Sequence, residues 1–168
     1  MQSEEVLAAL DRSFTWRPIG IVRTPYLHGK EVPKGLGAQH QAEGTIEIAP
    51  EFVDGLRDID GFSHLYLLWV FDRVHGFDLV SHPPTDDRPH GVFATRSPQR
   101  PNPLGLTVVE LLGVERRLDG ASLRVRGVDM LDLTPLLDIK PYLSSVPAER
   151  LRRGWLAEAE ARRHDPAR

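Results

Sequence analysis

The chain has 168 residues, 40% of them hydrophobic and 27% charged, with a formal net charge of −3. This composition is that of a folded protein with its own core, and the length suits one domain with short terminal extensions. The lack of cysteine excludes disulfides and thiolate metal sites, and the negative balance argues against a broad electrostatic attraction to nucleic acid.

The N-terminal residues 3–12 are predicted to form a short helix. Ser3 can cap it, two glutamates suit its positive end, and an apolar stripe follows. This acidic start lacks the positive charge of a signal peptide. No apolar run reaches the roughly 18 to 20 residues of a membrane span. We therefore expect a cytoplasmic protein without a membrane segment.

The rest of the chain is predicted to be mainly β. Residues 64–71, HLYLLWVF, are continuously apolar and predict a strand buried on both faces, with a buried helix as the alternative. A closing amphipathic helix is expected over residues 147–164, with a Glu158–Arg162 pair on its surface. The expected strands cover residues 18–24, 44–49, 64–71, 91–94, 106–114, 121–128 and 136–143, with long loops at 27–43 and 72–89.

Many short strands with helices only at the ends predict a small β-barrel. We expect this barrel domain to span residues 16–146. It would lie between a helical extension, residues 1–15, and a C-terminal helix, residues 147–168.

Residues 91–105, GVFATRSPQRPNPLG, combine arginine, asparagine and three prolines. Proline fixes its own φ and pushes the preceding residue towards extended geometry. The pattern therefore predicts a stiff, extended segment with Arg96, Arg100 and Asn102 on one face. Two guanidinium groups and an amide suit a carboxylate, a phosphate or a nucleobase edge. A solvated proline-rich turn is the alternative.

Two other polar groups attract attention. Glu110 would share its strand face with apolar neighbours, so it lies either on a solvent face or in a place that needs a carboxylate. Asp138, Lys140 and Tyr142 alternate in LDIKPY and could project together, with a surface ion pair beside a tyrosine as the alternative. The seven histidines are dispersed and form no H-E-x-x-H motif, so no metal site is expected.

Four motifs, in this order, resemble the TsaA-like proteins of the TrmO family: IGIVRTPY at residues 19–26, DGFSHL at 60–65, the segment 91–105, and DIKPYL at 138–143. The resemblance implies a small β-barrel that uses S-adenosylmethionine to methylate N6 of threonylcarbamoyladenosine beside the tRNA anticodon. It also implies a homodimer with the cofactor near the subunit interface. Many members carry a second, C-terminal domain, and this chain resembles the single-domain form.

For the methyl transfer that the resemblance implies, we hypothesise that Asn102, Tyr142 and Asp138 orient the target amine or accept its proton. Arg96 and Asn102 would contact the substrate. The loop at residues 33–35 matches less well, since the family's P-R-Q is P-K-G here. The implied cofactor contacts are Pro33, Lys34, Gly35, Asp72, Arg73, Arg100, Glu110, Leu137, Asp138, Ile139 and Lys140.

Without the second domain, tRNA contacts could come from arginines of the closing helix, gathered in a dimer. A solvated helix face is the alternative for this set, which comprises Arg150, Arg152, Arg153, Arg162 and Arg163. Two other functions stay open. One is a non-catalytic module that binds S-adenosylmethionine or RNA and regulates another process. The other is a methyltransferase acting on another RNA or on a small molecule.

Overall fold

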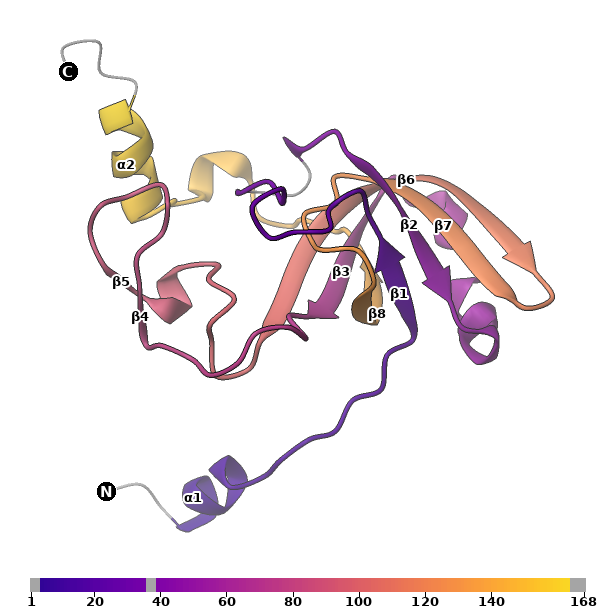
Figure 1. The fold of residues 1–168 in the computed structure, drawn as a ribbon, viewed down its shortest axis with the longest axis horizontal. Coiled ribbons are helices and arrows are strands. Elements are labelled where there is room, and N and C mark those ends of the chain that lie inside the picture. Colours follow the sequence, from indigo (N-terminus) through magenta and orange to yellow (C-terminus); the bar gives the residue numbers. More distant parts are fainter. Residues whose placement is uncertain (1–3, 36–38, 164–168) are drawn as a thin grey trace.

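The computed structural model describes residues 4–35 and 39–163 (Figure 1). Six antiparallel strands close a barrel in the order β1-β2-β7-β6-β3-β8. Their bounds are β1 Gly20–Arg23, β2 Glu43–Ile48, β3 His64–Val70, β6 Leu104–Arg117, β7 Gly120–Arg126 and β8 Thr134–Pro141. The expectation of a mainly-β small barrel is confirmed. No helix within the described ranges is long and apolar enough to cross a membrane.

Smaller elements lie around the barrel. Strands β4, Val80–Ser81, and β5, His90–Gly91, pair as a separate ribbon. Four one- or two-turn 3₁₀ helices connect the described elements: η2 Pro50–Leu56, η3 Ile59–Gly61, η4 Val92–Ala94 and η5 Ala148–Arg150. The predicted strand over residues 91–94 is therefore wrong beyond Gly91, because the chain turns into η4 there.

The barrel core is built by alternate residues of each strand. In β3, Leu65, Leu67 and Trp69 are buried, whereas the residues between them are half-buried. The helix alternative for this run is thus wrong, and so is the expectation of burial on both faces. The outward side chains of β3 instead belong to a partly open surface.

Strand β8 contains a bulge that changes which residues face the core. Leu68 lies opposite Asp138 while Trp69 lies opposite Leu136, so Leu137 is the extra residue. Leu136 is fully buried, and Ile139 packs against the core three residues later. A bulge of this kind reverses the two-residue alternation, which turns Asp138 outward.

The two terminal helices differ in how they meet the barrel. Helix α1, Glu4–Leu10, stands at the end of an extended segment, away from the barrel (Figure 1). Its apolar side chains are exposed, and the proposed Ser3 cap lies outside the described residues. The single closing helix is wrong, because Gly154, with a φ of 53°, separates η5 from α2, Trp155–Arg163.

Candidate functional site

Strands β8, β3 and β6 are neighbours, and their outward residues form one surface, which we call the β8–β3–β6 face. Leu106 on it is 49% exposed, and Tyr66, Leu68 and Val108 beside it are half-buried. The outward residues of β3 and β6 therefore form an apolar strip, and charged residues of β8 lie along one side of this strip. The strand register places two rows on it: Asp138, Leu68 and Leu106, then Lys140, Tyr66 and Val108.

Asp138 and Lys140 form an ion pair on this face, with 2.8 Å between Nζ and Oδ2. The Asp138 carboxylate also accepts a hydrogen bond from the backbone N–H of Ile139 at 2.9 Å. Both charged side chains are about half exposed. An ion pair this exposed contributes little to stability and opens readily. The pair can therefore exchange its internal contact for a ligand.

Tyr142 lies at the end of the face where β3 begins. Its backbone N–H donates to the carbonyl of His64 at 3.0 Å. Its ring centroid lies 5.1 Å from that of Tyr66 and 6.3 Å from that of His64. Asp138, Lys140 and Tyr142 thus project to the same side of the sheet, as their alternation predicts.

The proline-rich segment lies at the opposite end of β3. The backbone N–H of Phe71 donates to the carbonyl of Pro103 at 2.8 Å. The segment is bent by two three-residue turns. In these, the backbone N–H of Arg100 donates to the carbonyl of Pro98, and that of Leu104 donates to the carbonyl of Asn102. The expected extended geometry is wrong, since proline restricts φ but leaves its own ψ free to turn.

The two arginines of this segment bind backbone carbonyls. Nη1 of Arg100 donates to the carbonyls of Thr95 at 3.2 Å and Ser97 at 3.1 Å. Nη2 of Arg96 donates to the carbonyl of Leu106. A guanidinium group has five N–H donors, so each arginine keeps others for a ligand. Arg100 thus braces the segment itself, whereas Arg96 ties the segment to β6, so the two side chains do not share one face of an extended strand.

Arg73 and Asp72 follow β3 at this same end. Nη2 of Arg73 donates to the carbonyl of Asp132 at 2.6 Å, and Asp72 lies 4.0 Å from the Arg73 guanidinium. The loop at residues 33–35 is irregular, with Pro33 half-buried and Lys34 exposed. Gly35 there has a φ of 114°, a conformation that favours glycine.

Glu110 points outward, half-exposed, and its carboxylate pairs with Arg126 at 2.8 Å. It lies opposite His64 across the strands, so it belongs to the Tyr142 end of β3. Arg126 also pairs with Glu43 at 3.0 Å. The solvent-face interpretation of Glu110 therefore fits its position, with an arginine neutralising its charge.

One copy of the chain does not bring all predicted site residues together. Strand β3 has seven residues and spans about 20 Å. Asp138 and Lys140 lie between its two ends. Near the start of β3 lie Tyr142 and Glu110, and near its end lie Asp72, Arg73, Arg96, Arg100 and Asn102.

A buried hydrogen-bond chain beneath the proline-rich segment was not foreseen. Trp69 Nε1 donates to Thr107 Oγ1 at 3.0 Å, and Thr107 donates to Asp129 Oδ1 at 2.5 Å. Burial raises the pKa of Asp129, although Thr107 partly offsets this. The Trp69 ring also covers Gly105, where a Cβ would lie 2.1 Å from the indole. The only sequence signal is the glycine that ends the motif.

A second unforeseen cluster joins α2 to the β4–β5 ribbon. The covered carboxylate of Asp86 accepts from Arg88 at 3.1 Å and Arg162 at 3.0 Å, and lies 3.2 Å from His90. The hydrogen bonds from Arg88 first, and then from His90, hold the pKa of Asp86 well below its usual range. Trp155 stacks on His90 with centroids 4.1 Å apart.

The closing arginines are largely engaged within the chain. Arg162 binds Asp86 rather than the expected Glu158, which instead lies 3.5 Å from Arg88. Arg153 pairs with Glu160, and Arg163 donates to the carbonyl of Pro84. Three of the five arginines suggested as tRNA contacts are thus engaged within the chain, and two of them, Arg162 and Arg163, hold α2 against residues 84–86.

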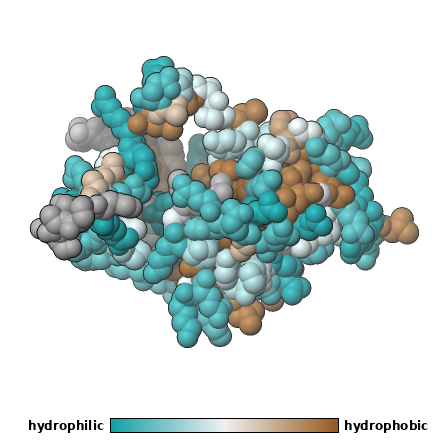
Figure 2. All heavy atoms as spheres, turned by 90° about the horizontal axis from the view of Figure 1, so that it is seen from above, coloured by the Kyte–Doolittle hydropathy of each residue, from teal (hydrophilic) through white to brown (hydrophobic). Residues whose placement is uncertain are grey.

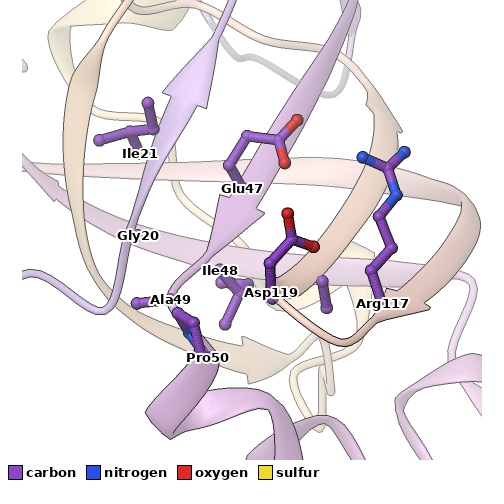
Figure 3. A pocket seen from close by; sticks show the side chains of 10 residues that line it. Gly20, Ile21, Glu47, Ile48, Ala49, Pro50, Arg117 and Asp119 are labelled. Carbon is purple, nitrogen blue, oxygen red and sulfur yellow. The ribbon is translucent and has the colours of Figure 1, made fainter.

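A pocket of about 310 Å³ lies apart from these residues, between β1, β2 and the β6–β7 hairpin. Figure 3 shows Glu47, Arg117 and Asp119 projecting into the same space. The pocket contains none of the residues that the motifs assign to the site. Within the described ranges, no group of three or more His, Asp or Glu side chains could hold a metal ion.

Comparison with known proteins places these motifs in a family. The profile of the tRNA-methyltransferase O N-terminal domain matches residues 21–148. A probable S-adenosyl-L-methionine-binding protein of Pyrococcus abyssi is 49% identical over 142 residues, which cover 84% of this chain and 75% of that protein. The tRNA (adenine(37)-N6)-methyltransferase of Escherichia coli is 38% identical, with 78% of this chain and 58% of that protein covered.

The fold agrees with this similarity. The crystal structure of TrmO from Pseudomonas aeruginosa has a TM-score of 0.68 and 33% sequence identity, and the match covers 86% of this chain and 63% of that one. The chain therefore spans about three fifths of the bacterial methyltransferases that it matches. Motifs, profile and barrel agree, and the chain belongs to the TrmO family, in the part that corresponds to the tRNA-methyltransferase O N-terminal domain.

Proposed function

We propose that this chain is a cytoplasmic, S-adenosylmethionine-dependent methyltransferase that acts on N6 of threonylcarbamoyladenosine beside the tRNA anticodon. The observation that carries the proposal is the placement of the two most specific motifs. DIKPYL supplies one side of the β8–β3–β6 face, and the proline-rich segment leads into the strand on its other side. The names of the relatives from Pyrococcus abyssi and Escherichia coli support the cofactor and the reaction.

The residues on this face fit S-adenosylmethionine. The cofactor combines a sulfonium cation, an amino acid with both charges, and an adenine ring. Asp138 and Lys140 provide opposite charges in an exposed pair, and the Tyr66 and Tyr142 rings provide aromatic surface. Arg100 retains guanidinium donors suited to a carboxylate. When bound, the cofactor supplies a methyl group that is already electrophilic.

The remaining work falls to the side chains of this chain. The amide of Asn102 can orient the N6 group, and the Asp138 carboxylate or Tyr142 hydroxyl can accept its proton. Arg96 can bind the threonyl carboxylate or a phosphate through its unused donors. Arg96, Asn102 and Tyr142 are exposed and the Asp138 side chain is half exposed, so a substrate can reach these groups.

A homodimer would assemble a complete site from these groups. Asn102 and Tyr142 lie at opposite ends of β3, about 20 Å apart along the strand. A second copy that packs its β8–β3–β6 face against the first, antiparallel, would bring the two ends together. The exposed apolar strip around Leu106 is the kind of surface that such packing covers.

The decisive experiment combines cofactor binding with product analysis. Calorimetry should show binding of S-adenosylmethionine, and incubation with total tRNA should yield a new methylated adenosine by nucleoside mass spectrometry. Asn102→Ala and Tyr142→Phe should each slow single-turnover methyl transfer while leaving cofactor affinity within a few fold. Binding without any new methylated nucleoside would favour the regulatory module. Methyl transfer to another acceptor would favour the second alternative.

A further inference from the structure

Phe93 lies near the start of the proline-rich segment, and its side chain is 76% exposed. Phenylalanine usually gains free energy from burial, so a ring left in solvent needs a specific setting to be informative. Two features of the surroundings make Phe93 more than an isolated surface residue. They are the rigidity of its backbone and the chemistry of its neighbours.

The backbone of Phe93 is fixed on both sides. Val92 is buried, and its N–H donates to the carbonyl of Leu79 at 2.9 Å. The carbonyl of Ala94 accepts a hydrogen bond from Trp155 Nε1 at 2.9 Å. Thr95 N–H closes the η4 turn on Val92 at 3.1 Å. The ring is therefore presented to solvent from a rigid turn, which reduces the entropy lost when a ligand binds it.

The neighbours supply a second aromatic ring and two cations. Phe77 is 57% exposed, and the next residue, Asp78, donates its N–H to the carbonyl of Gln99 in the proline-rich segment. Arg100 binds the carbonyl of Thr95, two residues after Phe93, and Arg96 binds that of Leu106 on β6, and both arginines keep unused donors. Exposed aromatic faces beside guanidinium groups are typical of sites that bind unpaired nucleotides, where bases stack and phosphates pair.

We propose that Phe93, supported by Phe77, forms a stacking platform for an unpaired base of the RNA loop that carries the methylated adenosine. This inference rests on the proposed function, because an N6 amine inside a stacked loop must be presented to the enzyme. The platform lies on η4, outside the β8–β3–β6 face to which we assign the second copy. An RNA loop is thus the occupant that its mixture of aromatic rings and arginines favours.

The test compares Phe93→Leu and Phe93→Trp with a matched control, Phe62→Leu. Leucine keeps an apolar side chain but removes the aromatic face, whereas tryptophan keeps it. Phe62, 38% exposed, lies before the start of β3, at the end opposite the platform. The probe is a fluorescein-labelled anticodon stem–loop RNA for affinity, and the same RNA with 2-aminopurine in its loop reports stacking by fluorescence quenching.

Phe93→Leu should weaken RNA binding about tenfold and reduce the quenching. Phe93→Trp should preserve both, and Phe62→Leu should match the wild type. Equal RNA affinity of wild type and Phe93→Leu would overturn the platform while leaving the proposed function intact. A loss of S-adenosylmethionine affinity in Phe93→Leu would make the ring a cofactor contact, and a changed oligomeric state would make it a subunit contact. Either result overturns the platform.

The proposed function fails in a different way from the platform. It would be contradicted by a wild-type protein that binds S-adenosylmethionine but neither binds the stem–loop nor methylates tRNA. The platform falls with it in that case, since no RNA loop would then be the ligand. Unfolding midpoints of all three variants should equal that of the wild type, because each replaced ring is exposed.

Discussion

Gly105 shows how one residue connects the proline-rich segment to the barrel core. A side chain at this position has no room, because the indole ring of Trp69 lies where a Cβ would be. Trp69 is in turn fixed by its hydrogen bond to Thr107, which binds Asp129. The start of β6, and with it the segment that carries Asn102, therefore rests on a packed aromatic ring.

We expect Gly105→Ala to lower the free energy of unfolding by about 1–3 kcal/mol, because the new methyl group must displace the indole. Chemical denaturation followed by tryptophan fluorescence measures this. Gly113→Ala in the same strand is the control, since no atom lies within 4 Å of its added Cβ. Equal destabilisation by both substitutions would show that strand glycines, rather than contact with Trp69, cause the effect.

Asp129 predicts a dependence of stability on pH. Burial raises its pKa above that of the unfolded chain, so the native state binds a proton more tightly. Its contribution to stability is therefore fully present below about pH 4, the unfolded pKa, and is lost as the pH rises through the native pKa. Asp129→Asn, which keeps an oxygen acceptor for Thr107, should remove this decline. Urea midpoints of the two proteins between pH 4 and 8 provide the comparison, and parallel curves would contradict it.

At the scale of elements, the position of α2 is held by a cluster of side chains, most of which come from residues 86–90. Asp86 gathers Arg88, His90 and Arg162, and Trp155 covers His90. The helix thereby also reaches the carbonyl of Ala94, near the start of the proline-rich segment. Loss of this docking would loosen η4 as well as the helix.

Acid should release α2. The pKa of Asp86 lies below its usual range in the fold, so its ionised form stabilises docking fully above about pH 4. This contribution is lost as the pH falls below that range, and Asp86→Asn should lose it at every pH. Hydrogen exchange of the α2 amides measures the docking. Arg153→Ala breaks only the pair with Glu160 and should leave exchange near Asp86 unchanged.

The elements that the sequence predicts well are those with a local signal. Alternating burial marks β2 and β7, and Asp119–Gly120 marks the turn between β6 and β7. The docking of α2 has no such signal, because Asp86 and Arg162 are 76 positions apart. The bend of the proline-rich segment also escapes prediction, since it depends on ψ angles that proline does not restrict.

For the whole molecule, the central question is what covers the β8–β3–β6 face. Apolar side chains gather over the barrel part of the molecule, while hydrophilic ones dominate elsewhere in the same view (Figure 2). The barrel class was predictable from strand number and spacing. The separation of the site residues along β3 was not, because it depends on which strands become neighbours.

Leu106→Glu should convert the proposed dimer to a monomer and abolish methyl transfer without unfolding the chain, because Leu106 is half exposed within the strip. A charged group in the middle of an apolar interface remains unpaired and desolvated, which opposes association. Sedimentation velocity measures the mass. Leu118→Glu, at the fully exposed tip of the β6–β7 hairpin, is the control. A Leu106→Glu protein with unchanged mass would place the interface elsewhere.

The bulge at Leu137 makes the number of residues before the DIK motif as important as their identity. Thr134 and Asp138 are an even number of positions apart, yet Thr134 is buried and Asp138 is half exposed on the outer face. At this even separation, strict alternation without the bulge would direct the Asp138 carboxylate into the apolar interior. The extra residue at Leu137 is therefore what keeps the DIK motif on the outer face, so the site is encoded partly as a count.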